Sequence, residues 1–75
     1  MNKSYAVLCM CEDLMKGKTL TIENCLAEYA ISVPTFRRYI SLLRMYFAER
    51  HSTELIYDKN LKGYRLEKNG NVKEL

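Results

Sequence analysis

Three arginines and several hydroxyl-bearing residues lie between positions 32 and 44 of this 75-residue chain, and their chemistry suits contact with a polyanion. A guanidinium group can donate paired hydrogen bonds to phosphate oxygens or to the O6 and N7 atoms of guanine. Hydroxyl groups and free backbone N–H groups at the start of a helix can hold a phosphate. This stretch therefore indicates a nucleic-acid contact. The candidate contact residues are Ser32, Pro34, Thr35, Arg37, Arg38, Ser41 and Arg44.

One helix, over residues 33–47, is expected to present these side chains. Four large apolar residues recur at spacings of four and three, which places them on one helical face, and the polar candidates lie on the opposite face. Ser32 can act as the N-cap, and Pro34 falls in the first turn, where a proline lacks no needed donor. The apolar residues are Phe36, Ile40, Leu43 and Phe47.

A shorter helix is predicted just upstream, over residues 20–30, with Thr21 as a candidate cap. Only Ile31 and Ser32 separate it from the basic helix, and we expect Ile31 to pack between the two. A short helix, a tight turn and a longer basic helix form a helix-turn-helix, whose second helix enters the DNA major groove. The plainer alternative is an ordinary surface helix with solvated charges. The residues expected to face inward are Ile22, Cys25, Leu26, and Tyr29 or Ala30.

The first predicted helix, over residues 4–16, is apolar around much of its circumference. Such a helix has more apolar surface than a small three-helix core needs to cover. Part of it, formed by Val7, Met10 and Leu14, is therefore a candidate contact surface for a second copy or for another domain. A wide core-facing surface is an equally good interpretation. Gly17 is expected to end this helix in a left-handed conformation, and residues 18–20 to form a minimal strand.

A β-hairpin is predicted after the basic helix, with strands over residues 54–57 and 64–67. We expect the basic helix to fray after Phe47, and His51 to be a solvated loop residue without a catalytic partner. The turn between the strands carries the candidate phosphate contacts Lys59, Asn60 and Lys62. Residues 68–75 are expected to form a flexible tail.

These elements predict one α+β, mainly α, domain over residues 1–67: a three-helix winged helix-turn-helix with a two-stranded hairpin wing. The net charge is +3, but its distribution is uneven. Residues 1–36 carry three Lys or Arg against four Asp or Glu, whereas residues 37–75 carry nine against five. The positive surplus therefore lies in the basic helix and the hairpin, which favours a nucleic-acid partner.

Several other classes of protein are disfavoured. The three cysteines form no spacing typical of a metal site, and their odd number in a chain without a recognisable signal peptide points to a reducing cytoplasm. No apolar run approaches the length of a membrane span. There is no paired carboxylate, activated nucleophile or glycine-rich phosphate loop. We therefore expect no enzyme activity, cofactor, metal or membrane contact, and a cytoplasmic, prokaryotic protein that associates with the nucleoid when bound.

Two linked motifs resemble the N-terminal DNA-binding domain of the WYL-domain transcriptional regulators, which is close to the DeoR-type winged helix. The pattern Val-Ser-x-x-Thr-Ile-x-Arg-Asp-Leu of those domains is similar to residues 31–40 here, and Ile-x-Tyr-Asp followed by Gly-Tyr is similar to residues 56–58 and 63–64. The resemblance covers residues 5–67 and implies DNA contacts by Ser32, Thr35 and Arg38. This chain lacks the family's extra residue before Tyr57 and Asp58, and it has Tyr39 where the family has Asp. Its 75 residues also include no effector domain.

The sequence thus favours a small, sequence-specific double-stranded DNA-binding regulator that acts as a repressor, with base contacts near the start of the basic helix and a backbone contact at Arg44. A dimer through the first helix would supply a second half-site. The start methionine and coherent tail favour a self-sufficient regulator of a phage or mobile element over a fragment. Two alternatives stay open: an excisionase-type architectural factor that bends DNA for a recombinase, and a winged-helix module that docks on another protein.

Overall fold

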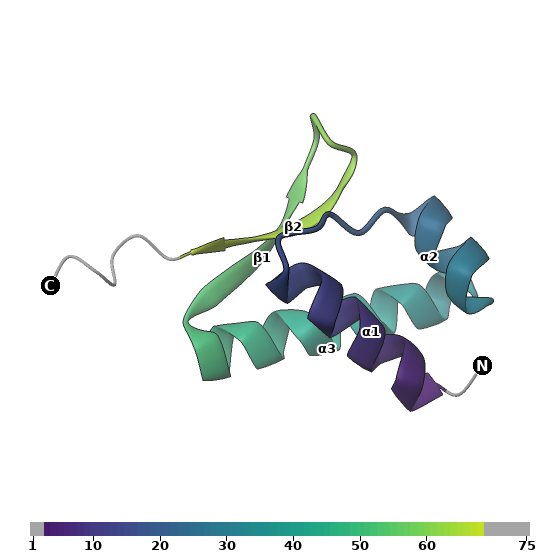
Figure 1. Cartoon of the computed structure of the whole chain (residues 1–75), viewed down its shortest axis with the longest axis horizontal. Coiled ribbons are helices and arrows are strands. Elements are labelled where there is room, and N and C mark those ends of the chain that lie inside the picture. The colour runs from purple at the N-terminus through teal and green to yellow at the C-terminus, as the bar shows by residue number, and fades with distance from the viewer. Residues whose placement is uncertain (1–2, 69–75) are drawn as a thin grey trace, which may run out of the picture.

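Three helices followed by a β-hairpin make up the computed structural model, which describes residues 3–68 (Figure 1). The hairpin strands are antiparallel, with Thr53 opposite Lys68 and Asp58 opposite Gly63. The hairpin packs against the third helix, so the expected α+β architecture is confirmed, and it is compatible with a winged helix-turn-helix. The elements are α1 (Lys3–Met15), α2 (Ile22–Tyr29), α3 (Val33–His51), β1 (Thr53–Asp58) and β2 (Gly63–Lys68).

One hydrophobic core joins all of these elements. Helix α1 crosses in front of α3, α2 lies near the N-terminal end of α3, and the hairpin projects away from the helices (Figure 1). The face of α3 predicted from its apolar spacing is the face that is buried, and Tyr39 is buried with it. The core residues are Ala6, Met10, Leu14, Leu20, Cys25, Tyr29, Phe36, Tyr39, Ile40, Leu43, Phe47 and Leu55.

The expected surface role of the Val7, Met10 and Leu14 stripe is wrong, because Met10 and Leu14 are almost completely buried in the core. The exposed apolar side chains of α1 are instead Tyr5, Leu8 and Met15, which lie on the opposite face of the helix. Sequence periodicity showed two apolar stripes on α1 but could not decide which of them meets α3. That choice depends on the contacts between the two helices.

The two predicted helix starts are confirmed by their side-chain caps. The Thr21 hydroxyl accepts a hydrogen bond from the Asn24 backbone N–H at 3.2 Å. Helix α2 is shorter than predicted, because Leu20 lies in an extended segment and Ala30 adopts a left-handed conformation with φ of 52°. The inward face of α2 consists of Cys25 and Tyr29, with Ile22 and Leu26 partly buried beside them, whereas Ala30 is exposed. Ile31 is partly buried and packs against the core.

Helix α3 continues four residues beyond the predicted end at Phe47 and stops at His51. The left-handed Ser52 then caps it, with a backbone N–H donated to the Phe47 carbonyl. The prediction of His51 as an isolated loop residue is therefore wrong. Its ring lies against Tyr46 and Phe47, and its Nε2 is 3.1 Å from the Tyr46 hydroxyl. The aromatic contacts explain why a polar residue extends the helix.

A short extended segment anchors the hairpin to the helices. The Leu20 and Tyr64 backbones exchange two hydrogen bonds of 2.8 Å, so the predicted minimal strand over residues 18–20 forms one bridge to β2. Gly17 has a φ of 87°, as expected of a left-handed helix end. Both hairpin strands are one residue longer at each end than predicted, and β2 includes Lys68. The rest of the predicted tail, residues 69–75, lies outside the described residues.

Candidate nucleic-acid interface

The solvent-facing side of α3 carries most of the basic candidate residues. Arg37, Arg38 and Ser41 are exposed, and they lie away from the apolar face that fixes α3 in the core. Pro34 is exposed in the first turn, while Thr35 is partly buried. The core thus holds the helix rigidly and leaves its guanidinium groups free to meet a ligand. A rigid helix lowers the entropy lost when such groups bind.

The N-terminal turn of α3 is organised by two hydroxyl groups. The Ser32 hydroxyl accepts a hydrogen bond from the Thr35 backbone N–H at 3.3 Å and donates one to the Thr35 hydroxyl at 3.1 Å. This reciprocal arrangement satisfies one of the free N–H groups of the turn. Both hydroxyls can still accept a hydrogen bond from water, or donate one to an anion after a small rotation.

One nitrogen of the Arg44 guanidinium forms a hydrogen bond within the protein. Its Nε donates a hydrogen bond of 3.3 Å to the Leu55 carbonyl of β1, which ties the middle of α3 to the hairpin. The side chain is nevertheless exposed, so its terminal nitrogens are available to a second acceptor.

The hairpin turn is fixed by a single carboxylate. Asp58 accepts hydrogen bonds from the backbone N–H groups of Asn60 at 2.8 Å and Leu61 at 3.1 Å, and from Arg65 Nε at 2.9 Å. These donors, Arg65 first, hold the pKa of Asp58 below its ordinary range. The turn therefore presents Lys59 and the Asn60 side chain to solvent in one defined backbone conformation.

Lys62 occupies a left-handed conformation with φ of 56°, which is unfavourable for a residue with a Cβ. Glycine is the usual residue at such a position in a turn. The lysine therefore introduces local backbone strain into the turn.

The start of α3 and the hairpin meet in a groove with a volume of about 270 Å³. Arg37 lines it from α3, Lys62 from the turn and Tyr57 from β1. Two positive charges and a half-exposed aromatic ring thus face one space, although Glu23 of α2 also lines it. Tyr57 belongs to the second matched motif, but it was not among the candidate contact residues. The groove that it lines becomes visible only when the hairpin is placed against α3.

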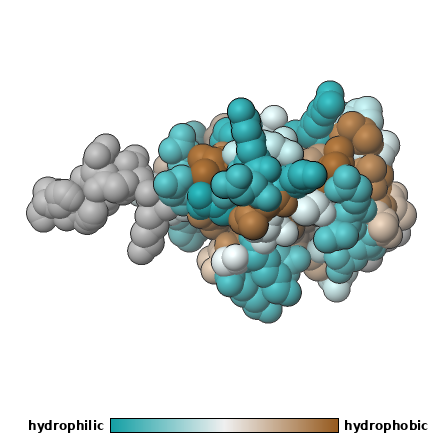
Figure 2. Space-filling model, turned by 90° about the horizontal axis from the view of Figure 1, so that it is seen from above, coloured by the Kyte–Doolittle hydropathy of each residue, from teal (hydrophilic) through white to brown (hydrophobic). Residues whose placement is uncertain are grey.

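The surface around the projecting hairpin is mainly hydrophilic, with small hydrophobic areas between the polar side chains (Figure 2). The candidate residues lie in two regions, the outer side of α3 with its N-terminal turn and the hairpin turn. Arg37 of the first region and Lys62 of the second line the same groove. Lys59 and Asn60 lie at the far end of the hairpin turn. The structure therefore places the candidates of α3 and the hairpin on connected parts of the surface.

Metal-ligand clusters, thiols and membrane spans are other possible functional features of the described part of the chain. Residues 3–68 contain no group of three His, Cys, Asp or Glu side chains placed to hold a metal ion. Burial, with a smaller effect of Glu28 and Asp13, raises the pKa of the Cys25 thiol to about 11, so it is protonated at neutral pH. No helix among these residues has the length and hydrophobicity needed to span a bilayer.

Comparisons with protein-family models, with curated proteins and with solved structures gave no match to this chain.

Proposed function

We propose that this chain is a sequence-specific double-stranded DNA-binding protein and a small transcriptional regulator of the repressor type. In this proposal α3 lies in the major groove and the hairpin acts as a wing on the adjacent backbone. The observation that carries it is the exposed row of Arg37, Arg38 and Ser41 on a helix whose other side is locked into the core. The basic hairpin beside this row supports the same partner.

The candidate residues are assigned to base edges or to phosphates according to their position relative to the start of α3. Pro34, Thr35 and Arg38 lie in the N-terminal half of the helix, which approaches base edges in helix-turn-helix complexes. Arg38 is the residue best suited to guanine, because it is exposed and makes no hydrogen bond or ion pair with any described residue. Arg37, Arg44, Lys59 and Lys62 are assigned to phosphates, which position the protein without specifying sequence.

The resemblance to the WYL-domain and DeoR-type regulators supports this proposal, and the structure gives physical reasons for its matched residues. Gly63 and Tyr64 of the second motif join the hairpin to Leu20. Ser32 and Thr35 of the first motif cap α3. Tyr39 replaces the Asp of that family and is buried in the core, so its role here is packing.

Binding of random and selected duplex DNA at two salt concentrations tests the proposal. We expect binding at low salt that weakens steeply as salt is raised, since each neutralised phosphate releases counterions. We expect Arg38→Ala to cost about 1–3 kcal/mol on the selected site and to relax preference at one base pair. Arg50→Ala is the matched control, because Arg50 is exposed on the same helix but lies beyond the proposed contact region.

Two outcomes would redirect the assignment. Equal losses for Arg38→Ala on selected and random DNA would remove its base-specific role. Absence of binding at both salt concentrations would overturn the proposal and favour a winged-helix module that docks on another protein. A large bend of the selected duplex, measured by gel mobility of circularly permuted fragments, would favour an excisionase-type architectural role over simple repression.

A further inference from the structure

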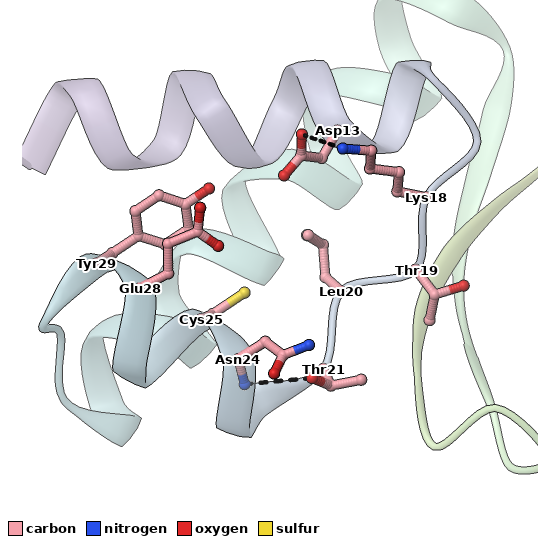
Figure 3. A pocket seen from close by; sticks show the side chains of 9 residues that line it. All are labelled: Asp13, Lys18, Thr19, Leu20, Thr21, Asn24, Cys25, Glu28 and Tyr29. Carbon is pink, nitrogen blue, oxygen red and sulfur yellow. Dashed lines mark hydrogen bonds and ion pairs between the residues drawn. The ribbon is translucent and has the colours of Figure 1, made fainter.

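A polar pocket lies between α1, α2 and the extended segment that joins them (Figure 3). Its volume is about 240 Å³, enough for several water molecules or one small organic ligand. The end of α1 contributes Asp13, and α2 contributes Asn24, Glu28 and Tyr29. Leu20 closes one side of it. None of these residues belongs to the arginine row of α3 or to the hairpin turn.

Tyr29 supplies a hydroxyl group that has no hydrogen-bond partner among the described residues, although most of its side chain is buried. Its side chain is only 4 % exposed, and its hydroxyl makes no hydrogen bond to any of the described residues. The ring is fixed in the core, and the hydroxyl points into the space between α1 and α2 (Figure 3). None of the buried side-chain nitrogen or oxygen atoms of the described residues lacks a partner, so this hydroxyl opens to solvent in the pocket, where water or a ligand can bond to it.

Two carboxylates face the same space. Asp13 projects from α1 toward α2, and Glu28 lies beside Tyr29 (Figure 3). Among the described residues that line the pocket, the one cation is Lys18. Its Nζ is 3.8 Å from Asp13 Oδ1, a long contact, and its side chain is largely exposed. Such a surface pair contributes little and is easily displaced. Glu28 forms no ion pair with any described residue.

The two carboxylates give the pocket a negative potential, which contributes to a raised pKa of Tyr29. Desolvation and the charges of Glu28 and Asp13 raise the pKa of Tyr29 to about 12, so its hydroxyl stays protonated at neutral pH. With Lys18 counted, the lining carries one net negative charge. The acceptors are two carboxylates, one phenol oxygen and the Asn24 amide oxygen. This set complements a cation that carries several N–H donors.

We propose that this pocket binds a small organic cation with N–H donors, an amine or a guanidine, through Asp13, Glu28 and Tyr29. One cationic group satisfies both carboxylates and the Tyr29 hydroxyl, while the alkyl part of the ligand lies against Leu20. The ligand displaces Lys18 from Asp13. The volume excludes larger molecules and is compatible with a chain of a few carbon atoms.

The position of the pocket connects it to the hairpin. Leu20 lines the pocket with its side chain and pairs through its backbone with Tyr64 of β2. A ligand that bridges α1 and α2 at this point therefore stabilises the folded domain and the base of the hairpin together. Since the effect on stability does not depend on DNA, binding to this pocket can be tested separately from the proposed function.

The test is a titration of the ¹⁵N-labelled full chain with 1,4-diaminobutane and, separately, with ethylguanidinium at constant ionic strength. The readout is the set of backbone amide shifts in two-dimensional NMR spectra, together with the thermal midpoint. We expect saturable shifts confined to residues around Asp13, Leu20 and Glu28, and a higher midpoint. The neutral analogue 1,4-butanediol should produce neither effect. Binding of only one probe supports the proposal and identifies the preferred cationic group.

Three variants and one control identify the contacts. Glu28→Gln and Asp13→Asn should each weaken binding about tenfold or more, because each removes a charge-assisted hydrogen bond. Tyr29→Phe keeps the packed ring and should weaken binding severalfold without loss of the fold, since its hydroxyl has no protein partner to lose. Glu23→Gln on the same helix lies outside the pocket and should leave binding unchanged.

The proposal is overturned if neither cation gives saturable shifts, or if the shifts spread evenly over all acidic residues. It is also overturned if Glu23→Gln weakens binding as much as Glu28→Gln, because the cations would then respond only to net charge. In both cases the pocket is a solvent-filled surface depression.

Discussion

Gly63 allows the hairpin to approach the segment between α1 and α2 closely, because it has no side chain. A Cβ at this position would lie 2.6 Å from the Thr19 methyl group and 2.7 Å from the Leu20 carbonyl oxygen. Both distances are shorter than any tolerable contact, and the second involves backbone that cannot rotate away. Gly17 differs, since its φ is positive but its surroundings are open.

We therefore expect Gly63→Ala to destabilise the domain by about 1–3 kcal/mol or more, through forced separation of the two segments. Gly17→Ala is the matched control and should cost only about 1 kcal/mol, the price of a left-handed alanine. Chemical denaturation of both variants measures the difference. Equal losses would mean that the contact between Leu20 and the hairpin is loose in solution.

Asp58 should make stability depend on pH in the acid range. Its pKa is lower in the folded chain than in the unfolded chain, so its ionised form contributes stability that is fully present above about pH 4. That contribution is lost as the pH falls through the folded-state pKa. We expect Asp58→Asn to be less stable than the parent at pH 7, with the gap closing toward pH 2.5. Glu54→Gln, an exposed change on β1, should show no such convergence in urea denaturation.

At the scale of the elements, the turn between α2 and α3 contains one residue, Ala30, in an unfavourable left-handed backbone conformation. Ala30 ends α2 with a φ of 52°, a conformation that glycine adopts without steric cost. We expect Ala30→Gly to stabilise the domain by about 1 kcal/mol. Ala27→Gly, in the exposed interior of α2, should instead destabilise it by about 0.5–1 kcal/mol. Thermal denaturation that showed the same sign for both variants would contradict this account of the turn.

Lys62 carries both a strained backbone conformation and a positive charge in the hairpin turn. Substitution of Lys62 should therefore change the stability of the fold and its DNA binding in different ways. Lys62→Gly should stabilise the fold by about 1 kcal/mol, because it removes the left-handed lysine. Both Lys62→Gly and Lys62→Ala should weaken binding to all duplexes alike and lower the salt slope by about one. Salt titrations of binding measure this. A loss confined to one sequence would contradict a phosphate contact by the wing.

At the scale of the whole molecule, α1 has an apolar face that no other described element covers. Tyr5, Leu8 and Met15 are each more than half exposed on this face. One copy of so small a domain contacts few base pairs, and a second copy would double the DNA site. We therefore propose a dimer in which the exposed faces of two α1 helices pack together.

Leu8→Glu should convert this dimer into a monomer, because it places a charge at the centre of the apolar face. Sedimentation equilibrium measures the change, and the spectrum of the folded monomer should stay native, since Leu8 is 65 % exposed. Leu61→Glu, an equally polar change in the hairpin turn, should leave the oligomeric state as it was. A parent chain that is monomeric at high concentration would exclude a dimer through α1.

The sequence alone was sufficient for the features that depend on neighbouring residues. The caps at Thr21 and Ser32, the buried face of α3, the left-handed Gly17 and the hairpin all follow from spacing and residue type. The candidate arginines followed from the same periodicity, since the face opposite an apolar stripe must meet solvent.

Only the tertiary structure decided which surfaces meet. It buried Met10 and Leu14 of α1, and it tied Arg44 to Leu55. It also placed Arg37 and Lys62 along one groove and Tyr29 beside Asp13 and Glu28 in a second pocket. Periodicity fixes the faces of each element, but these contacts join residues far apart in the chain. They depend on how the elements pack, which no local pattern specifies.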